Sequence, residues 1–371
     1  MKVSLTYIVS HIDKALAFEW VAKRLNKERF NLSFILLNPA DSQLEAYLKF
    51  HQIRFLRIKY SGKRHIISAF LQTYRYLRRS KVDIVHTHLF DANLVGLLAA
   101  YLAGVKKRIH TRHNSTIHHE YFPKAVKYDK LANFLSTDII AISKVVEEVL
   151  HKMEGVNLSK ITLIHHGFDF DEIPSETDLR VKKVENKYHF SEMDIIVGVV
   201  SRYIHWKGIQ YIIPAFKEFR KAYPNAKLVL ANASGPYRKE ISKALQTLDL
   251  SSYVEIPFEE DIFSLFRNFS FLIHVPLNSK AEAFGQVYIE AMACEVPMIV
   301  TKSGIANEIV EHKKNALVVP FKDSKSIIEA LGKLMNNPDL SRKIRSNGKK
   351  MALDNFDVKK MIAQLEYLYE K

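Results

Sequence analysis

The feature that most constrains the fold is a regular alternation of short apolar runs and amphipathic stretches along the 371 residues. The apolar runs have the length and composition of buried strands, and helical periodicity lies between them, as in Ile209–Ala222 and Ser324–Met335. This alternation predicts parallel sheets with helices on both faces. The predicted strands are Val3–Val9, Leu32–Leu37, Ile53–Ile58, Val82–His86, Arg108–Thr111, Asp138–Ile142, Ile161–His165, Ile195–Val200, Lys227–Ala231, Tyr253–Ile256, Phe271–Val275, Met298–Thr301 and Ala316–Val319.

The length of the chain exceeds that of a single core of common size and indicates two domains. A charged segment with little strand character, Phe168 to Asp194, is the predicted linker. Ligands of open parallel sheets bind beyond the carboxyl ends of the strands, so the predicted site is a cleft between the two domains. The predicted division is a first domain at 1–170, a linker at 171–193, a second domain at 194–355 and a final segment at 356–371.

The composition of the chain indicates the cellular compartment that it suits and the enzyme classes that it disfavours. The single cysteine excludes an internal disulfide, which fits a reducing compartment. The N-terminal run MKVSLTYIVSHIDK is too short for a transmembrane helix and lacks a signal-peptide cleavage pattern, so we expect a cytoplasmic protein. No two of the 12 glycines are two positions apart, which argues against the dinucleotide fingerprint of nicotinamide and flavin enzymes.

Positive charge is concentrated in the first part of the chain. Residues 1–150 hold 24 basic and 12 acidic side chains, and residues 51–80 hold eight basic and no acidic ones. Such a region either attracts anions, such as a phospholipid surface, or is a solvated face that keeps the protein soluble. A nucleic-acid-binding protein is the weaker interpretation of the net charge of +15, because no recognition motif accompanies it.

The stretch SKAEAFGQVYIEAMACEVPMIV, Ser279 to Val300, indicates a ligand site at a helix start. Phe284, Gly285 and Gln286 are predicted to open a helix whose free N–H groups suit a phosphate. Glycine also lets a ligand approach the backbone closely. Glu282 and Glu290 could accept hydrogen bonds from sugar and ribose hydroxyls. The alternative is an amphipathic helix with an exposed glutamate and a loop glutamate.

A second candidate lies in VGVVSRYIHWKGIQYIIPAF, where Arg202 and Lys207 follow a buried strand. Two cations at the carboxyl end of a strand could neutralise a departing diphosphate. The alternative is a pair of solvated loop cations.

These motifs resemble those of the retaining GT-B glycosyltransferases of family 4. Glu282 to Glu290 resembles the E-x7-E motif of that family, and Arg202 with Lys207 resembles its R-x4-K pair. The resemblance continues through NEIV and NALVVP in the C-terminal half, and more loosely through DIVHTH, HTRHN, AISK and ITLIHHGFD in the N-terminal half. It implies the GT-B fold, in which two Rossmann-like, doubly wound α/β domains face a central cleft and the last helix crosses back to the N-terminal domain.

The resemblance also implies roles for individual residues. Arg202 and Lys207 would hold the diphosphate of a nucleotide-sugar donor. Glu282, with the backbone at Phe284 and Gly285, would bind the donor sugar and phosphates, and Glu290 the ribose. His113 matches a histidine near the reaction centre, and Gln286 lies at the start of the same binding helix. No metal and no cofactor are expected beyond the donor itself, because cations and a helix dipole take the place of a metal.

The implied activity is retaining transfer of a hexose, from UDP-sugar rather than GDP-sugar by family habit, to a glycan or lipid-linked acceptor. Front-face attack is the usual description, with the leaving diphosphate helping to deprotonate the acceptor. The alternatives are a sugar-nucleotide epimerase of GT-B type and a binding protein without transfer. A metal site in the clustered histidines is a further alternative: His86, His88, His110, His113, His118 and His119.

The basic region 54–81 indicates where the acceptor is located. Apolar residues at 66, 67, 70, 71, 74 and 77 have helical spacing and are predicted to pack on the sheet, which leaves the cations to contact an anionic membrane surface. We therefore expect peripheral attachment to the inner membrane face.

The sequence departs from the family pattern in VSHIDKAL, which lacks a glycine pair, and at Glu295, which replaces a helix-ending glycine and predicts an altered cap.

Overall fold

The computed structural model describes residues 2–371, which form two compact units. The first unit contains the described residues up to Phe168 together with Val358–Lys371, and the second contains Asp169–Asp357. Residues 171–193, the predicted linker, are grouped with the second unit and contain the helix α8, Leu179–Lys187. Val181 and Val184 of this helix are buried, and α8 packs against the helix α11, Ile262–Arg267.

The first unit is built on a seven-stranded sheet in which all neighbouring strands are parallel. The strand order is β3-β2-β1-β4-β5-β6-β7, so the order reverses between β1 and β4. The strands are β1 Val3–Ser10, β2 Phe30–Asn38, β3 Arg54–Lys59, β4 Ile84–His88, β5 Lys107–Arg112, β6 Asp138–Ala141 and β7 Ile161–Leu163.

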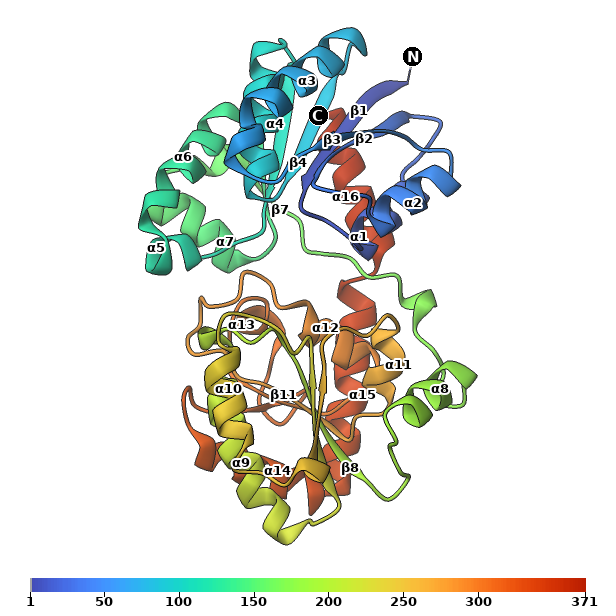
Figure 1. The fold of residues 1–371 in the computed structure, drawn as a ribbon, viewed down its shortest axis with the longest axis vertical. Helices are drawn as coiled ribbons and strands as arrows, with labels where there is room; N and C mark the ends of the chain where they lie inside the picture. The colour runs from blue at the N-terminus through green and yellow to red at the C-terminus, as the bar shows by residue number, and fades with distance from the viewer. Residues whose placement is uncertain (1) are drawn as a thin grey trace. The chain divides into compact units, whose positions relative to one another are not determined.

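Helices cover both faces of this sheet. The helices α3 and α4 pack side by side on one face with α6 beside α4, and α1 lies with α2 and α16 on the other face (Figure 1). The helices are α1 Leu16–Arg24, α2 Gln43–Phe50, α3 Ile66–Arg79, α4 Phe90–Leu102, α5 Ile117–Tyr121, α6 Val126–Leu135, α7 Lys144–Glu148 and α16 Val358–Glu370.

The last helix, α16, is part of the core of the first unit. It buries an apolar stripe that includes Leu365 and Leu368. The phenol of Tyr369 is hydrogen-bonded to that of Tyr7 on β1, and its oxygen lies 2.8 Å from Nδ1 of His86 on β4. Because these buried groups bond to one another, α16 satisfies polar atoms that the sheet alone would leave unpaired.

The second unit has a six-stranded parallel sheet in the order β10-β9-β8-β11-β12-β13, with the reversal between β8 and β11. Its strands are β8 Ile195–Val200, β9 Ala226–Ala231, β10 Tyr253–Ile256, β11 Phe271–His274, β12 Met298–Val300 and β13 Leu317–Val318. Its remaining helices are α9 Ile209–Ala222, α10 Arg238–Leu245, α12 Gln286–Ala293, α13 Ala306–Ile309, α14 Ser324–Met335 and α15 Pro338–Asn355.

In this second unit, α9 lies between α10 and α14 on one face of the sheet, and α12 packs against α15 on the other face (Figure 1). An aspartate caps the start of α14: Asp323 accepts hydrogen bonds from the first backbone N–H groups of this helix. The core consists of strand residues such as Val197, Leu228 and Ile273 with helix residues such as Phe216. The two parallel sheets with helices on both faces confirm the predicted fold class.

The prediction for α3 is confirmed in part. Leu77 belongs to the core of the first unit, and Phe70 and Tyr74 pack against that core, whereas Leu71 is exposed. The helix buries Ala69, Thr73 and Leu77, whereas Ile66 and Ile67 are exposed. Packing against α4 and the sheet selects the face spaced at every fourth residue from 69 to 77, so of the predicted stripe only Leu77 is fully buried. No helix within residues 2–371 is both long and apolar enough to cross a membrane.

Candidate functional site

The predicted site residues Lys207 and Glu282 are in direct contact in the second unit. Lys207 ends a short 3-10 turn that follows β8, and its Nζ lies 2.6 Å from Oε1 of Glu282. His274, the last residue of β11, donates its Nε2–H to the same oxygen at 3.0 Å. Lys207 and Glu282 thus come from opposite sides of the β8–β11 reversal, the position where open parallel sheets bind ligands.

Charge pairing keeps the Glu282 carboxylate ionised. Burial raises its pKa, but the Lys207 ammonium and the hydrogen bond from His274 together lower the pKa well below its usual value. Burial also lowers the pKa of His274, so its ring is neutral. Both contacts reach Oε1, and within residues 2–371 no hydrogen bond or ion pair is made to Oε2. That oxygen is available to accept a hydrogen bond from a ligand hydroxyl.

Two glycines allow the close packing of the loop around Glu282. Gly285 precedes α12 with a φ of 87°, in the left-handed region. A Cβ on Gly304 would lie 2.6 Å from the carbonyl oxygen of Phe284 and 2.7 Å from Cβ of Glu282. That carbonyl accepts a hydrogen bond from the backbone of Ile305 at 2.8 Å. The helix α12 starts as predicted, and Gly285 supplies no side-chain cap for its first N–H groups.

Glu290 lies more than one turn into α12 and is half-buried. Burial raises its pKa to about 7. Within the described chain its carboxyl group makes no hydrogen bond or ion pair, and none links it to Lys207 or Glu282. An uncompensated carboxyl of this kind is typical of a group that meets its partner on the ligand.

Arg202 follows β8 by two residues and its side chain is exposed. No hydrogen bond or ion pair to its guanidinium occurs in residues 2–371, so it can bind an anion without breaking an existing contact. Gln286, the first residue of α12, is also exposed. Arg202, Lys207, Glu282 and Glu290 all belong to the second unit.

His113 belongs to the first unit and directly follows β5. Its Nε2 lies 3.1 Å from Nδ1 of His88, and its ring stacks on His166 with centroids 5.5 Å apart. Burial lowers the pKa of His113 to about 4, so the ring is neutral at physiological pH.

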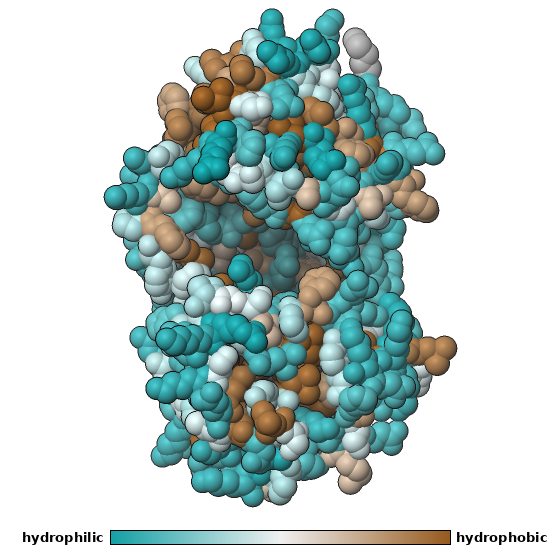
Figure 2. Space-filling model, in the orientation of Figure 1, coloured by the Kyte–Doolittle hydropathy of each residue, from teal (hydrophilic) through white to brown (hydrophobic). Residues whose placement is uncertain are grey.

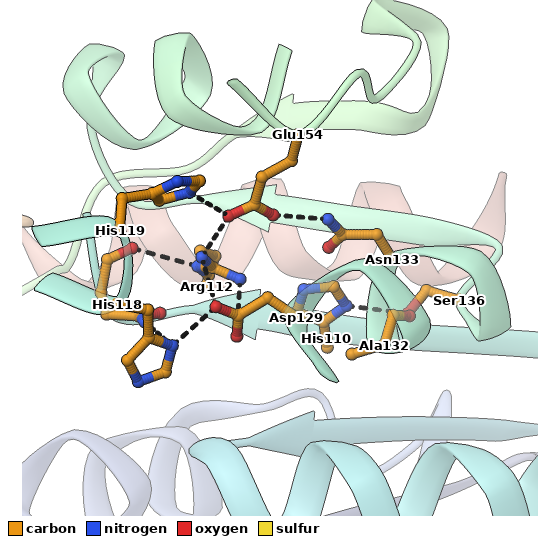
Figure 3. A network of polar contacts seen from close by, with 10 residues as sticks. His110, Arg112, His118, His119, Asp129, Ala132, Asn133, Ser136 and Glu154 are labelled. Atoms are coloured by element: carbon orange, nitrogen blue, oxygen red, sulfur yellow. Dashed lines mark hydrogen bonds and ion pairs between the residues drawn. The ribbon is translucent and has the colours of Figure 1, made fainter. Parts of the chain in front are cut away.

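Apart from His88 and His113, the clustered histidines bond to side chains other than histidine. His118 is bonded to Asp129 at 2.6 Å and His119 to Glu154 at 3.1 Å, and the buried Arg112 joins both carboxylates (Figure 3). Among residues 2–371, no group of three or more histidine, cysteine, aspartate or glutamate side chains is arranged to hold a metal ion.

Two family models and several relatives match most of the chain. Residues 181–351 match the model of glycosyl transferases group 1, and residues 21–172 match that of glycosyltransferase family 4. The capsular polysaccharide biosynthesis glycosyltransferase CapM of Staphylococcus aureus is 29% identical over 316 residues, which cover 82% of this chain and 80% of CapM. Together the two models span both units. The chain is a family 4 glycosyltransferase.

Two further relatives extend the comparison. The alpha-monoglucosyldiacylglycerol synthase of Acholeplasma laidlawii is 24% identical over 302 residues, covering 74% of this glycosyltransferase and 71% of that enzyme. The crystal structure of the Anabaena protein HepE in complex with UDP and glucose superposes with a TM-score of 0.85 at 20% identity, covering 99% of both chains. The structural likeness confirms the GT-B fold.

Sequence reasoning missed two residues that form hydrogen bonds with Glu282. His274 gave no signal, because a lone histidine at the end of an apolar strand is compatible with an ordinary core position. Ser303, whose Oγ accepts a hydrogen bond from the backbone N–H of Glu282 at 3.0 Å, gave none either. The altered cap predicted at Glu295 is confirmed: this residue has a φ of 59°, in the left-handed region that glycine normally occupies.

Proposed function

We propose that the protein transfers a hexose from a nucleotide sugar, UDP-sugar in preference to GDP-sugar, to a glycan or lipid-linked acceptor of the cell envelope. The observation that carries the proposal is the cation and carboxylate pair Lys207–Glu282 at the reversal of the second sheet. HepE, with the same fold, was crystallised with UDP and glucose, and CapM is named for capsular polysaccharide biosynthesis. The Acholeplasma relative is named as an alpha-monoglucosyldiacylglycerol synthase, which supports a lipid-linked acceptor as well.

The chemistry assigns a task to each group. The exposed Arg202 and the ammonium of Lys207 bind the diphosphate, whose negative charge grows as it leaves. The ionised Glu282 accepts hydrogen bonds from sugar hydroxyls, and Glu290 from the ribose. The bond between the anomeric carbon and the diphosphate breaks, the acceptor oxygen bonds to that carbon, and its proton passes to the leaving diphosphate. Front-face attack of this kind retains the anomeric configuration and uses no carboxylate nucleophile and no metal.

We further propose that the first unit contacts an anionic membrane from the inner side. The exposed apolar residues Ile66, Ile67 and Leu71 lie on α3, and the neighbouring α4 exposes Tyr101 and Leu102. Figure 2 shows hydrophobic residues gathered over α3 and α4 among hydrophilic ones. We call the side chains of Ile66, Ile67 and Leu71, in the first turns of α3, the apolar patch. Basic residues of 54–81 flank the apolar patch along the chain, and their positive charge suits a lipid surface that carries negative charge.

A thermal-shift screen against UDP-, GDP-, ADP- and CMP-sugars tests the donor. A ligand at about 100 times its Kd stabilises the native state by about 2.7 kcal/mol, so we expect a clear rise in Tm with the UDP-sugar that is used. Lys207→Met and Arg202→Gln should each reduce this rise, while Lys217→Met, at an exposed position on α9, should leave it unchanged. No shift with any of the four nucleotide classes would contradict the proposal.

Product analysis then separates transfer from the alternatives. Mass spectrometry of donor-derived products with and without an envelope glycan acceptor should detect a new glycoside only with acceptor. An altered sugar nucleotide formed without acceptor would instead indicate an epimerase. Proton NMR of the new linkage should give the anomeric configuration of the donor, and an inverted product would exclude the retaining mechanism.

A further inference from the structure

His113 is held by a second histidine from the neighbouring strand. His88 is the last residue of β4, which pairs with β5 so that His88 lies opposite Thr111. Only 6% of the surface of His88 is exposed, and its ring packs against Tyr7 and Phe18 with centroids 5.0 and 4.9 Å apart. Its Nδ1 is 3.1 Å from Nε2 of His113. A hydrogen bond between buried groups of this kind fixes the orientation of both rings.

Both rings are neutral at physiological pH. Burial is the main cause that holds the pKa of His88 well below its usual value, and the neighbouring His86 is the second. Burial also lowers the pKa of His113 to about 4. The contact therefore joins one N–H donor to one lone pair, and each ring has a single ring proton to place. Two arrangements are possible, which differ in the ring nitrogen that carries the proton.

The far side of His88 discriminates between the two arrangements. Its Nε2 is buried and has no hydrogen-bond partner among residues 2–371. If His113 donated from Nε2, His88 would have to carry its proton on Nε2, which would bury an N–H without an acceptor. If His88 donates from Nδ1, its Nε2 is only an unpaired acceptor. Buried N–H groups without acceptors are rarer in proteins than acceptors that lack a donor, so the second arrangement is favoured.

Neighbouring groups hold the rest of the arrangement in place. His86 is fully engaged, because its Nδ1 lies 2.8 Å from the Tyr369 hydroxyl and its Nε2 lies 2.8 Å from the Thr111 hydroxyl. The backbone around His113 is fixed by Arg112, whose Nε donates to the carbonyl oxygen of Asn114 at 3.1 Å. Figure 3 shows the guanidinium of Arg112 against the carboxylates of Asp129 and Glu154.

We propose that His88 is a positioning residue that donates its Nδ1–H to Nε2 of His113, so that His113 keeps its own proton on Nδ1. His113 then acts toward the ligand as an uncharged hydrogen-bond donor to an oxygen, a sugar hydroxyl or a phosphate, and Nε2 does not serve as a base. The role of His113 at the reaction centre rests on the proposed function, whereas its tautomer can be measured without any ligand.

The decisive measurement is NMR of the full chain with 15N-labelled histidine. Nitrogen shifts and long-range couplings distinguish a protonated from an unprotonated ring nitrogen, and His113→Asn identifies the signals of His113 by their loss. We expect the proton of His113 on Nδ1 and that of His88 on Nδ1 as well. A proton on Nε2 of His113 would overturn the proposal, whether or not the protein uses a nucleotide sugar.

Two variants of His88 connect the tautomer to the rate. In His88→Asn the side-chain amide can place an N–H at the position of Nδ1, whereas His88→Phe fills the ring volume without a donor. We expect His88→Phe to release the tautomer of His113 and lower kcat by about 10- to 100-fold, the range seen for residues that orient metal-bound histidines. His88→Asn should recover most of this loss, and the affinity for UDP should be unchanged in both.

These results also separate the two proposals. If His88→Phe keeps both the Nδ1 proton of His113 and the kcat of the unchanged protein, the positioning role is wrong. If the protein binds no nucleotide sugar while NMR gives the Nδ1 tautomer, the proposed function fails and the assignment of the hydrogen bond stands.

Discussion

At the scale of single residues, the carboxyl groups of Glu282 and Glu290 in the second unit have opposite electrostatic environments. Glu282 is paired with Lys207 and His274, so its ionised form is stabilised in the protein. Glu290 has no such partner, and burial raises its pKa to about 7. One carboxylate is therefore charged before a ligand arrives, whereas the other changes its charge near physiological pH.

Glu290 should make stability depend on pH in a defined direction. Its pKa is about 4.5 in an unfolded chain and about 7 in the native state, so stability falls as pH rises through this window and the loss is complete above it. We expect Glu290→Gln to remove this loss and to raise the free energy of unfolding at pH 8 by at most about 3 kcal/mol, with a smaller gain at pH 5.5. Urea unfolding at both pH values measures the difference.

The matched control for this prediction is Glu240→Gln, at an exposed position on α10, which should give no pH-dependent gain. An equal gain from Glu290→Gln at pH 5.5 and pH 8 would contradict the raised pKa.

At the scale of elements, the loop between β8 and α9 has the conformation that brings Lys207 to Glu282. Gly208 follows Lys207 with a φ of 79°, and a Cβ there would lie 1.9 Å from the carbonyl oxygen of Val275. Only glycine fits both requirements, so the backbone at this point passes directly over the end of β11.

Gly208→Ala should therefore destabilise the protein and separate Lys207 from Glu282. A left-handed φ costs a residue with a Cβ about 1–2 kcal/mol before the steric clash is added, so we expect a loss of about 2 kcal/mol or more together with weaker nucleotide binding. Thermal unfolding and titration with UDP measure the two effects. Gly332→Ala, inside α14 where a Cβ would meet nothing within 4 Å, should instead stabilise by up to about 1 kcal/mol.

Element positions were largely predictable from the sequence, whereas contacts between distant residues were not. The strands of both sheets followed from apolar runs, and β8 and β10 match their predicted bounds. The helix α8 was missed because it is strongly charged, and its buried residues Val181 and Val184 are too few to give a clear stripe. The motif predicted Lys207 and Glu282 as site residues, but their mutual contact spans 75 positions and has no local signature.

At the scale of the whole molecule, charge and apolar exposure coincide in one unit. The excess of positive charge lies in residues 1–150, and the apolar patch on α3 belongs to the same part of the chain. Cations attract an anionic bilayer at a distance, and apolar side chains add affinity only once they enter the interface. The two contributions can therefore be separated by salt and by substitution.

Flotation with vesicles of anionic and zwitterionic lipid tests the membrane contact. We expect binding to anionic vesicles at low salt, and weaker binding at high salt. Burial of one isoleucine side chain contributes about 1.5–3 kcal/mol, so Ile67→Asp should lower the partition coefficient by at least about tenfold. Leu250→Asp, at a highly exposed position in the second unit, should have no effect. Absence of binding to anionic vesicles at low salt would contradict the membrane proposal.

The position of α16 has a consequence for how the protein is made. The ribosome produces β1 and β4 early, but Tyr369, which bonds to Tyr7 and His86 on those strands, emerges only after the entire second unit. The core of the nascent first unit therefore stays incomplete, with part of its apolar surface exposed, until about 190 further residues have been translated. Chaperones that shield apolar surface have their longest opportunity there, and a stalled ribosome would leave the earlier half of the chain, not the later one, exposed to proteases.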